Sequence, residues 1–226
     1  MCQRYALTHD PEDVRNTFAY VNEETFPPRY NIAPTQPIAI VRLSYNQKRM
    51  LELVRWGLIP SWVKDPSDFS TLVNARAETV AVKPSFRGAI RHKRCLLPAS
   101  SFYEWTGTRG HKQPHLIKPL AGGVMAFAGI FEDWLGADGS ELRSAAILTV
   151  PANREMRTVH DRMPLILERE KFGAWLDCRS GLIEDITGWL RSPKDGILDI
   201  TPVSKALNNW RNDGPEVQEP IAPTLL

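Results

Sequence analysis

Cys2 follows the initiator methionine, so it would carry both a thiol and a free α-amine once Met1 is removed. An α-amine has an ordinary pKa of about 7.7–8.0, which leaves roughly a tenth of it unprotonated at neutral pH. Such an amine condenses with an aldehyde to an imine, and the thiol two carbons away can then close a five-membered thiazolidine. A cysteine inside the chain cannot do this because its nitrogen belongs to an amide. An exposed Cys2 therefore suits aldehyde capture or, as an N-terminal nucleophile, amide hydrolysis.

Two other residues could assist this chemistry. Arg4 shares a face with Cys2 if the segment is a strand, so we expect Arg4 to lower the pKa of the thiol or to bind a phosphate. In SFYEW (101–105), Glu104 stands between Tyr103 and Trp105. Desolvation by aromatic side chains would raise the pKa of this carboxyl and suit it to proton transfer. A strand glutamate that faces solvent is the alternative interpretation.

Two motifs combine a polar or titratable side chain with an arginine. In VHDRMP (159–164), His160 could move protons at neutral pH and Arg162 could pair with a phosphate. In TLVNARAET (71–79), Asn74 and Arg76 are two residues apart and would share one strand face, where they could hold an oxyanion or a sugar-phosphate. The alternatives are a structurally hydrogen-bonded histidine and an asparagine that merely ends a strand.

Aromatic and basic residues suggest a nucleic-acid surface. RWGLIPSW (55–62) places two tryptophans around a Gly and a Pro; we expect Trp56 in the core and Trp62 available for base stacking. The run VKPSFRGAIRHKR (82–94) contains Lys83 and Arg87 among five basic residues and no acid. A clustered cationic face attracts a phosphate backbone, although a solvated helix face has the same composition.

The elements that must position these residues are mainly strands. Strands outnumber helices and do not alternate with them regularly, which predicts an α+β fold. We expect one domain over residues 1–226, with a mixed, mostly antiparallel sheet or barrel-like core and helices packed outside. The predicted strands are 37–43, 51–56, 70–75, 94–99, 101–105, 114–118, 123–131 and 142–150, and the predicted helices are 10–24, 84–92, 168–176 and 183–191.

Composition excludes several classes. The chain has 226 residues, 42% of them hydrophobic, and a net charge of only +2, so it can bury a core and is not a disordered or fibrous protein. No signal pattern or membrane-spanning run is evident. Three widely spaced cysteines, with no metal-ligand spacing, favour a reduced, cytoplasmic protein without a metal or cofactor.

Several motifs together resemble the SOS-response-associated peptidase (SRAP) family, whose members are also described as abasic-site-processing proteins. The resemblance covers roughly residues 1–165, with the motifs in the family's order, and is weaker beyond, mostly in ITPVSKALNNW (200–210). The motifs are MC-x-RY at the start, RYNIAPTQ (29–36), RWGLIPSW (55–62), NARAET (74–79), SFR followed by RCLLPAS-x-FYEW (85–105) and VHDRMP (159–164).

The resemblance implies a single SRAP domain with a positively charged groove for single-stranded DNA. Cys2, exposed after loss of Met1, would capture the aldehyde of an abasic deoxyribose as a thiazolidine DNA–protein crosslink. Asn74 would position the sugar, Glu104 would be the acid or base, and His160 would assist proton transfer and crosslink reversal. The implied DNA contacts are phosphates at Arg4, Arg76 and Arg162 and bases at Trp62 and Trp105. The family's peptidase label implies self-removal of Met1.

The chain departs from the family's usual pattern at two positions. Gln3 and Ser101 stand where glycine is common, after the cysteine and before the FYEW segment. A glycine there would serve a backbone with positive φ or a close backbone approach.

Three functions follow from these residues. The leading hypothesis is a monomeric sensor of abasic sites in single-stranded DNA, associated with the nucleoid when it is bound. The alternatives are an N-terminal-nucleophile peptidase or amidase that acts mainly on its own Met1, and a non-covalent single-stranded DNA-binding module. Covalent capture, DNA-independent peptide turnover and salt-sensitive binding without a covalent product would distinguish the three.

Overall fold

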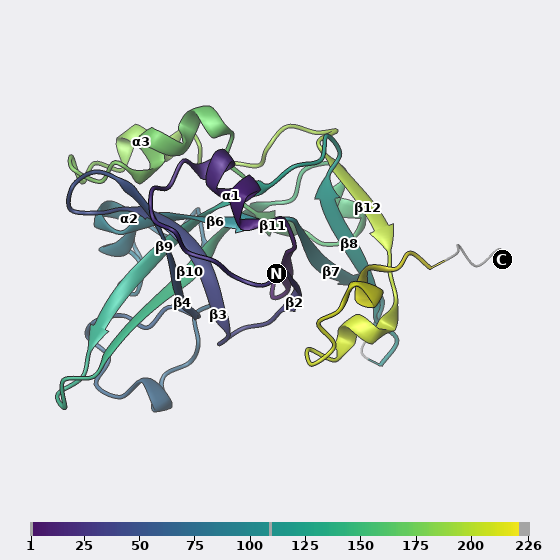
Figure 1. The fold of residues 1–226 in the computed structure, drawn as a ribbon, viewed down its shortest axis with the longest axis horizontal. Coiled ribbons are helices and arrows are strands. Elements are labelled where there is room, and N and C mark those ends of the chain that lie inside the picture. Colours follow the sequence, from purple (N-terminus) through teal and green to yellow (C-terminus); the bar gives the residue numbers. More distant parts are fainter. Residues whose placement is uncertain (1, 109, 222–226) are drawn as a thin grey trace.

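The computed structural model describes residues 2–108 and 110–221, which form two β-sheets with short helices outside them (Figure 1). The strands are β1 (Tyr5–Leu7), β2 (Arg29–Ile32), β3 (Pro37–Leu43), β4 (Arg49–Trp56), β5 (Asn74–Arg76), β6 (Arg94–Ala99), β7 (Ser101–Thr106), β8 (Gln113–Pro119), β9 (Met125–Leu135), β10 (Glu141–Pro151), β11 (Arg162–Pro164) and β12 (Leu198–Pro202). The α-helices are α1 (Pro11–Phe18), α2 (Ala89–His92), α3 (Phe172–Leu176) and α4 (Glu184–Thr187). Single 3₁₀ turns are η1 (Pro66–Asp68), η2 (Met156–Thr158), η3 (Arg169–Lys171), η4 (Lys205–Asn208) and η5 (Pro215–Gln218).

The larger sheet closes into a barrel. Its strands follow the order β10-β4-β3-β6-β9, and β9 pairs back onto β10 to complete a ring of five. β5 and β11 also pair with β10. β10 runs parallel to β4 and β5, and the other pairs are antiparallel. Closure leaves fewer unpaired sheet edges. The predicted α+β fold with a mixed, barrel-like core is confirmed.

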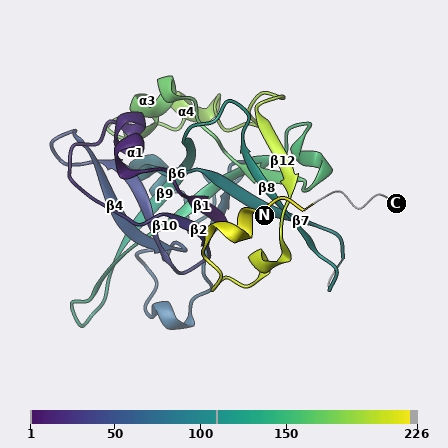
Figure 2. The same ribbon diagram turned by 45° about the vertical axis from the view of Figure 1, so that its right-hand side comes forward.

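The smaller sheet is antiparallel, in the order β12-β8-β7-β1-β2, and it carries the amino-terminal residues. β1 lies between β2 and β7, with Tyr5 opposite Phe102. In Figure 2, β1 and β2 lie between the strands of the barrel and β7 and β8. The Tyr5 ring packs edge-on against Trp56 and Phe127, with centroids 5.2 and 6.0 Å apart, so the core of the barrel anchors the start of the chain. Trp56 is fully buried, as the sequence predicts.

The carboxyl-terminal segment covers the other face of the smaller sheet. Tyr103 and Leu116 pack there against Val203, Leu207 and Val217 in a cluster separate from the main core. This segment appears in yellow beside β8 and β12 in Figure 1. Residues distant in sequence thereby come close to the first residues of the chain, as the hydrogen bond from Arg4 Nη1 to the Leu207 carbonyl shows (3.1 Å).

Helix α1 is shorter than the predicted helix over residues 10–24. Pro11 opens it and Val14 and Phe18 are buried, as expected, but Ala19 adopts a left-handed backbone (φ 54°) and ends it. Beyond that point the Val21 amide donates to the Arg49 carbonyl (3.0 Å) instead of continuing the helix. The helix therefore ends where its backbone begins to bond to the barrel.

Other predicted elements differ from the structure mainly in length. The helix over 168–176 is confirmed as η3 followed by α3, whereas those over 84–92 and 183–191 shorten to α2 and α4. The strand over 70–75 is confined to β5, because before it only Leu72 forms an isolated bridge, to Leu58. No helix in the described part of the chain is long and apolar enough to span a membrane.

Candidate functional site

Cys2 lies at the start of the smaller sheet, next to β7. The Tyr103 amide donates to the Arg4 carbonyl (3.0 Å), which continues the β1–β7 pairing beyond Tyr5 toward the amino terminus. The Cys2 thiol donates to the same carbonyl, with Sγ 3.6 Å from the oxygen. The Cys2 side chain is fully buried in the 226-residue chain. Sheet pairing draws the residue inward in this chain, and exposure of Cys2 after loss of Met1 stays a prediction.

Burial controls the thiol of Cys2. Desolvation raises the pKa of Cys2 well above its ordinary value, and the nearby charge of Glu104 raises it further. Arg4 acts on this pKa through its backbone, whose hydrogen bond with the thiol lowers it, while its guanidinium bonds to Asn31 Oδ1 (2.8 Å) and the Leu207 carbonyl. The thiol is thus protonated at neutral pH and has to pass its proton on when it reacts.

Asn74 contacts Cys2 directly. Its Nδ2 donates to the Cys2 carbonyl oxygen at 2.8 Å, and its Oδ1 is buried with no hydrogen-bond partner among the described residues. β5 positions this side chain by pairing in parallel with β10, with Asn74 opposite Ile147. A buried acceptor without a partner is costly, so its presence indicates a place for a donor from a ligand. Asn74 is therefore more than the end of a strand.

Glu104 is 4% exposed, so the alternative of a glutamate facing solvent is wrong. Burial raises the pKa of Glu104, while nearby positive charge, including that of Lys112, acts in the opposite direction. The same carboxylate raises the pKa of Cys2, which places the two groups within electrostatic reach of each other. A carboxyl with a raised pKa can hold a proton near neutrality and donate it.

His160 follows the η2 turn, in the loop before β11. The Arg162 backbone amide donates to His160 Nδ1 at 3.0 Å. Nδ1 is also 2.8 Å from a carboxylate oxygen of Asp161, whose side chain is 87% exposed and lies at the surface. The loop thus fixes the ring orientation through the backbone.

Besides Arg4, the sequence predicts Arg76 and Arg162 as phosphate ligands. These two side chains differ in how exposed they are to a ligand. Arg76 is exposed beside Asn74 and on its strand face, as predicted. Arg162 forms a bidentate pair with Glu78 (2.7 and 2.9 Å) and donates to the Thr149 carbonyl (2.6 Å), so its side chain is only 13% exposed. Glu78 must move or share Arg162 before a phosphate can bind there.

Trp62 and the basic run form one surface groove. Trp62 is 58% exposed and packs edge-on against Phe69. It lines a groove of about 390 Å³ together with Arg87 and Arg91. Lys83 is exposed one helical turn before Arg87, whose amide donates to the Lys83 carbonyl (2.9 Å). The structure thus brings the predicted stacking residue and part of the basic run together.

Trp105 lines a larger groove of about 570 Å³, called the Trp105 groove below. Of the residues that line it, only Trp105 and Arg4 were predicted from the sequence to bind DNA. The Trp105 indole donates to Asn208 Oδ1 (2.7 Å), which fixes the ring against the carboxyl-terminal segment. No local sequence signal joins these regions, because the groove forms only when that segment packs on the smaller sheet. The residues that line this groove include Gln3, Arg4, Thr35, Trp105, Lys112 and Trp210.

The positions where the family commonly has glycine need no special backbone here. Gln3 and Ser101 are absent from the described residues with positive φ. Ser101 begins β7 opposite Ala6, and its hydroxyl accepts a hydrogen bond from Gln218 (3.2 Å). Gln3 is exposed and contributes its side chain to the Trp105 groove. Both residues thus add side-chain contacts where glycine would have none.

With the cysteine, the amide, the carboxyl and the histidine in one region, comparison with known proteins becomes informative. The sequence matches the family described as "SOS response associated peptidase (SRAP)" over residues 1–210. The chain belongs to this family. Its described residues contain no group of three or more His, Cys, Asp or Glu side chains able to hold a metal ion.

The relatives extend over most of the chain. The abasic site processing protein YoqW of Bacillus subtilis is 36% identical over 97% of this chain and 99% of its own length. The abasic site processing protein HMCES of Xenopus tropicalis is 30% identical over 98% of this chain and 78% of its own. A crystal structure of a Bacteroides thetaiotaomicron protein shares the fold, with a TM-score of 0.88 at 24% identity, 98% coverage of this chain and 100% of its own.

Proposed function

We propose that this protein processes abasic sites in single-stranded DNA by forming a covalent thiazolidine between Cys2 and the abasic aldehyde. The observation that carries the proposal is the assembly of Asn74, Glu104 and His160 around Cys2. Asn74 bonds directly to the Cys2 carbonyl, and Glu104 interacts electrostatically with both the Cys2 thiol and His160. The names of the relatives YoqW and HMCES support the same substrate.

The reaction begins with the α-amine of Cys2 after Met1 has been removed. The unprotonated amine attacks the aldehyde carbon of the opened deoxyribose and gives a carbinolamine. Glu104, whose raised pKa keeps it protonated more readily, donates a proton to the departing hydroxyl, and water leaves as the imine forms. Asn74, fixed to the Cys2 carbonyl, has its Oδ1 available to accept a hydrogen bond from a sugar hydroxyl.

Ring closure uses the protonated thiol. The sulfur adds to the imine carbon, its proton passes through the Glu104 carboxylate or His160, and the imine nitrogen becomes a secondary amine. One aldehyde, one amine and one thiol give one thiazolidine and one water. Reversal requires the same proton movements in the opposite order, so the same residues would accelerate it.

The deciding experiment compares abasic and intact single-stranded oligonucleotides on a denaturing gel and by intact mass. The expected product has the mass of protein plus DNA minus one water and forms only with abasic DNA. Cys2→Ala should abolish it while leaving non-covalent binding. Cys2→Ala and Cys2→Ser both keep the amine of residue 2 once Met1 is removed but cannot form a thiazolidine, so each should give at most an imine that is detected only after borohydride reduction. Equal crosslinking by Cys2→Ala would overturn the proposal.

The same site is our candidate for removal of Met1, and intact masses of wild type and Cys2→Ala give the test. Retention of Met1 in Cys2→Ala alone would support self-removal. Retention in both would contradict both mechanisms that need a free Cys2 amine. Peptide turnover without DNA would favour the amidase alternative, and salt-sensitive binding without a covalent product would favour a simple DNA-binding module in the cell's nucleoid.

A further inference from the structure

His115 on β8 lies directly opposite Glu104 on β7. Residues that are directly opposite each other on antiparallel strands share one face of the sheet, and their Cβ atoms lie about 4.5–5.5 Å apart. His115 is half-buried, and no sequence motif points to it. The carboxyl group of the proposed mechanism therefore has a second histidine as its neighbour across the strands.

This pair lies on the face of the smaller sheet that packs against the barrel. Two residues along the strands, Phe102 and Ile117 also form a pair, and both are buried in the main core. Phe102 packs edge-on against Phe127 of β9, with ring centroids 5.8 Å apart. Every second side chain of a strand points to the same face, so Glu104 and His115 share this face. They therefore lie where the smaller sheet meets the barrel.

The groups around the pair belong to the same region. The Cys2 side chain is part of the main core, and the charge of Glu104 acts on its thiol. His160 and Lys112 act electrostatically on Glu104. On the other side of β8, the residue of β12 opposite the imidazole is a proline, which does not titrate. The imidazole thus has the carboxyl as its titratable neighbour within the sheet.

One ring nitrogen of His115 has a fixed role. Nδ1 lies 3.1 Å from the Gln113 carbonyl oxygen, and because a carbonyl only accepts hydrogen bonds, Nδ1 is the donor. In the neutral ring Nε2 then carries a lone pair. Burial lowers the pKa of His115, although the bond to Gln113 acts in the opposite direction, so the ring is neutral at neutral pH. The pairing thus sets a hydrogen-bond acceptor beside a carboxyl that burial favours in its protonated form.

We propose that His115 is a positioning residue for Glu104, whose protonated carboxyl donates a hydrogen bond to the neutral imidazole and is held beside Cys2 by it. This inference rests on the proposed function, which supplies the reaction that the proton serves. In imine formation the proton passes from Glu104 to the departing hydroxyl. At ring closure the carboxylate regains a proton from the Cys2 thiol, so His115 itself neither gains nor loses one. The lone pair of Nε2 gives the carboxylate no hydrogen bond and therefore favours this proton uptake.

The first test follows the Glu104 carboxyl by ¹³C NMR during a pH titration of the whole protein without DNA. Glu104→Gln assigns the signal. In His115→Gln the side-chain amide can donate to the carboxylate and favour its charged form. We expect the midpoint of the titration in this variant to lie at least about half a pH unit below that of wild type, the lower end for one hydrogen bond.

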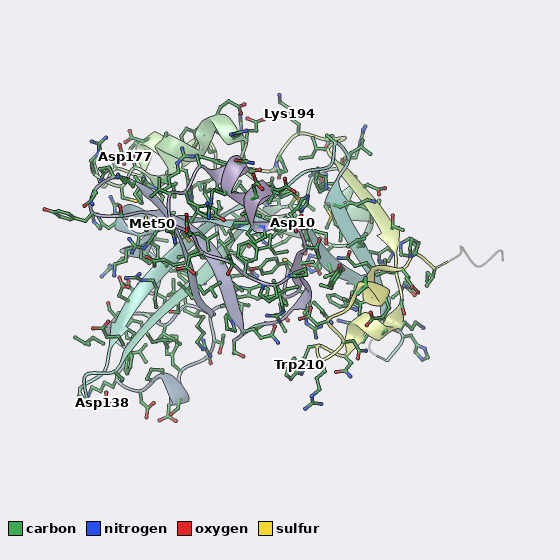
Figure 3. All side chains as sticks on the ribbon, viewed as in Figure 1. Asp10, Met50, Asp138, Asp177, Lys194 and Trp210 are labelled. Carbon is green, nitrogen blue, oxygen red and sulfur yellow. The ribbon has the colours of Figure 1, made fainter. Side chains whose placement is uncertain are left out.

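The second test measures crosslinking rates with abasic single-stranded DNA. His115→Phe removes the acceptor and should slow crosslinking about two- to tenfold, as loss of one hydrogen bond predicts. In a Glu104→Gln background the same substitution should cause no further loss, because His115 acts only through that carboxyl. His92→Gln is the matched control and should change neither readout. His92 is exposed on α2 and lines a pocket with Cys178, and the neighbouring Asp177 lies at the left of Figure 3, away from β7 and β8.

The two tests separate this inference from the proposed function. If the midpoint moves in His115→Gln but wild type forms no crosslink, the covalent mechanism is wrong and the pairing of His115 with Glu104 stands. A midpoint that does not move, or equal losses from His115→Phe in the wild-type and Glu104→Gln backgrounds, would overturn the inference while leaving the crosslink intact.

Discussion

Asn74 Nδ2 donates a hydrogen bond of 2.8 Å to the carbonyl oxygen of Cys2. This contact joins β5, which belongs to the barrel through β10, to the first residues of the smaller sheet. The relationship fixes the backbone of Cys2 while Asn74 Oδ1 stays without a partner in the described chain. One side chain therefore both fixes the Cys2 backbone and, in the proposed mechanism, offers an acceptor to the substrate.

Asn74→Ala should slow crosslinking by about tenfold or more, because loss of a hydrogen bond in a buried site costs about 1–3 kcal/mol. Asn74→Asp is the matched variant: it keeps an acceptor but cannot donate to the Cys2 carbonyl through Nδ2. Single-turnover crosslinking on a denaturing gel gives the rates, and non-covalent binding to intact DNA is the control. Unchanged rates in Asn74→Ala would remove Asn74 from the mechanism.

Glu104→Gln should lower the crosslinking rate by about a hundredfold, the lower end of general acid–base contributions. Burial raises the pKa of Glu104, so wild type should lose the acid-assisted step as the pH rises through that pKa. The amine of Cys2 instead gains reactivity with pH, so a bell-shaped profile is expected. In Glu104→Gln the high-pH limb due to the carboxyl should vanish, and a profile of unchanged shape would contradict the assignment.

Glu104→Gln should stabilise the folded protein at high pH, although it slows the proposed reaction. The folded protein binds the Glu104 proton more tightly than the unfolded chain does, so stability falls as pH rises from the ordinary carboxyl range through the raised pKa. Glu104→Gln removes this penalty and should raise the Tm at pH 8 more than at pH 5. About 1 kcal/mol corresponds to about 2–4 °C for a chain of this size. Thermal melts at the two pH values provide the measurement, and a Tm difference independent of pH would refute it.

Residue types and spacing were sufficient to nominate candidate reactive side chains, because each one has a functional group of its own that suits the proposed chemistry. These candidates are Cys2, Asn74, Glu104 and His160. The environment of each residue was not predictable in this way. Cys2 is buried because Tyr103 pairs with Arg4. The raised pKa of its thiol is thus a property of a strand pairing about a hundred residues apart in sequence.

The fold class followed from apolar runs rich in strand-forming residues, whereas closure of the barrel did not. β9 pairs with both β6 and β10 over long registers, and no local pattern specifies that second pairing. Helix α1 shows the same limit, since its end is fixed by a backbone bond from Val21 to β4. The Trp105 groove depends on Asn208 and Trp210 folding back onto the smaller sheet, which local periodicity does not reveal.

Glu78→Gln should increase affinity for intact single-stranded DNA. Glu78 holds Arg162 in a bidentate pair, and Arg162 keeps the pKa of the Glu78 carboxyl below its usual range, so the negative charge persists at neutral pH. Its removal frees Arg162 for phosphate and takes one anion from the binding face. We expect affinity to rise about two- to tenfold and the salt slope to steepen by about 0.7, the value for one contact on a single strand. Reduced affinity would show that Glu78 is needed to hold Arg162 in its binding position.

Lys83→Ala and Arg87→Ala should each weaken binding of intact single-stranded DNA uniformly across sequences. Both side chains are exposed, and Arg87 lines the same surface groove as Trp62. Each is therefore placed to neutralise one phosphate. Each loss should reduce the slope of log affinity against log salt by about 0.7, the value for one contact on a single strand. Lys48→Ala, at an exposed lysine in the β3–β4 turn, is the matched control and should leave the slope unchanged. Fluorescence anisotropy over a salt series measures all three, and equal slopes for Lys48→Ala and Arg87→Ala would place the DNA elsewhere on the protein.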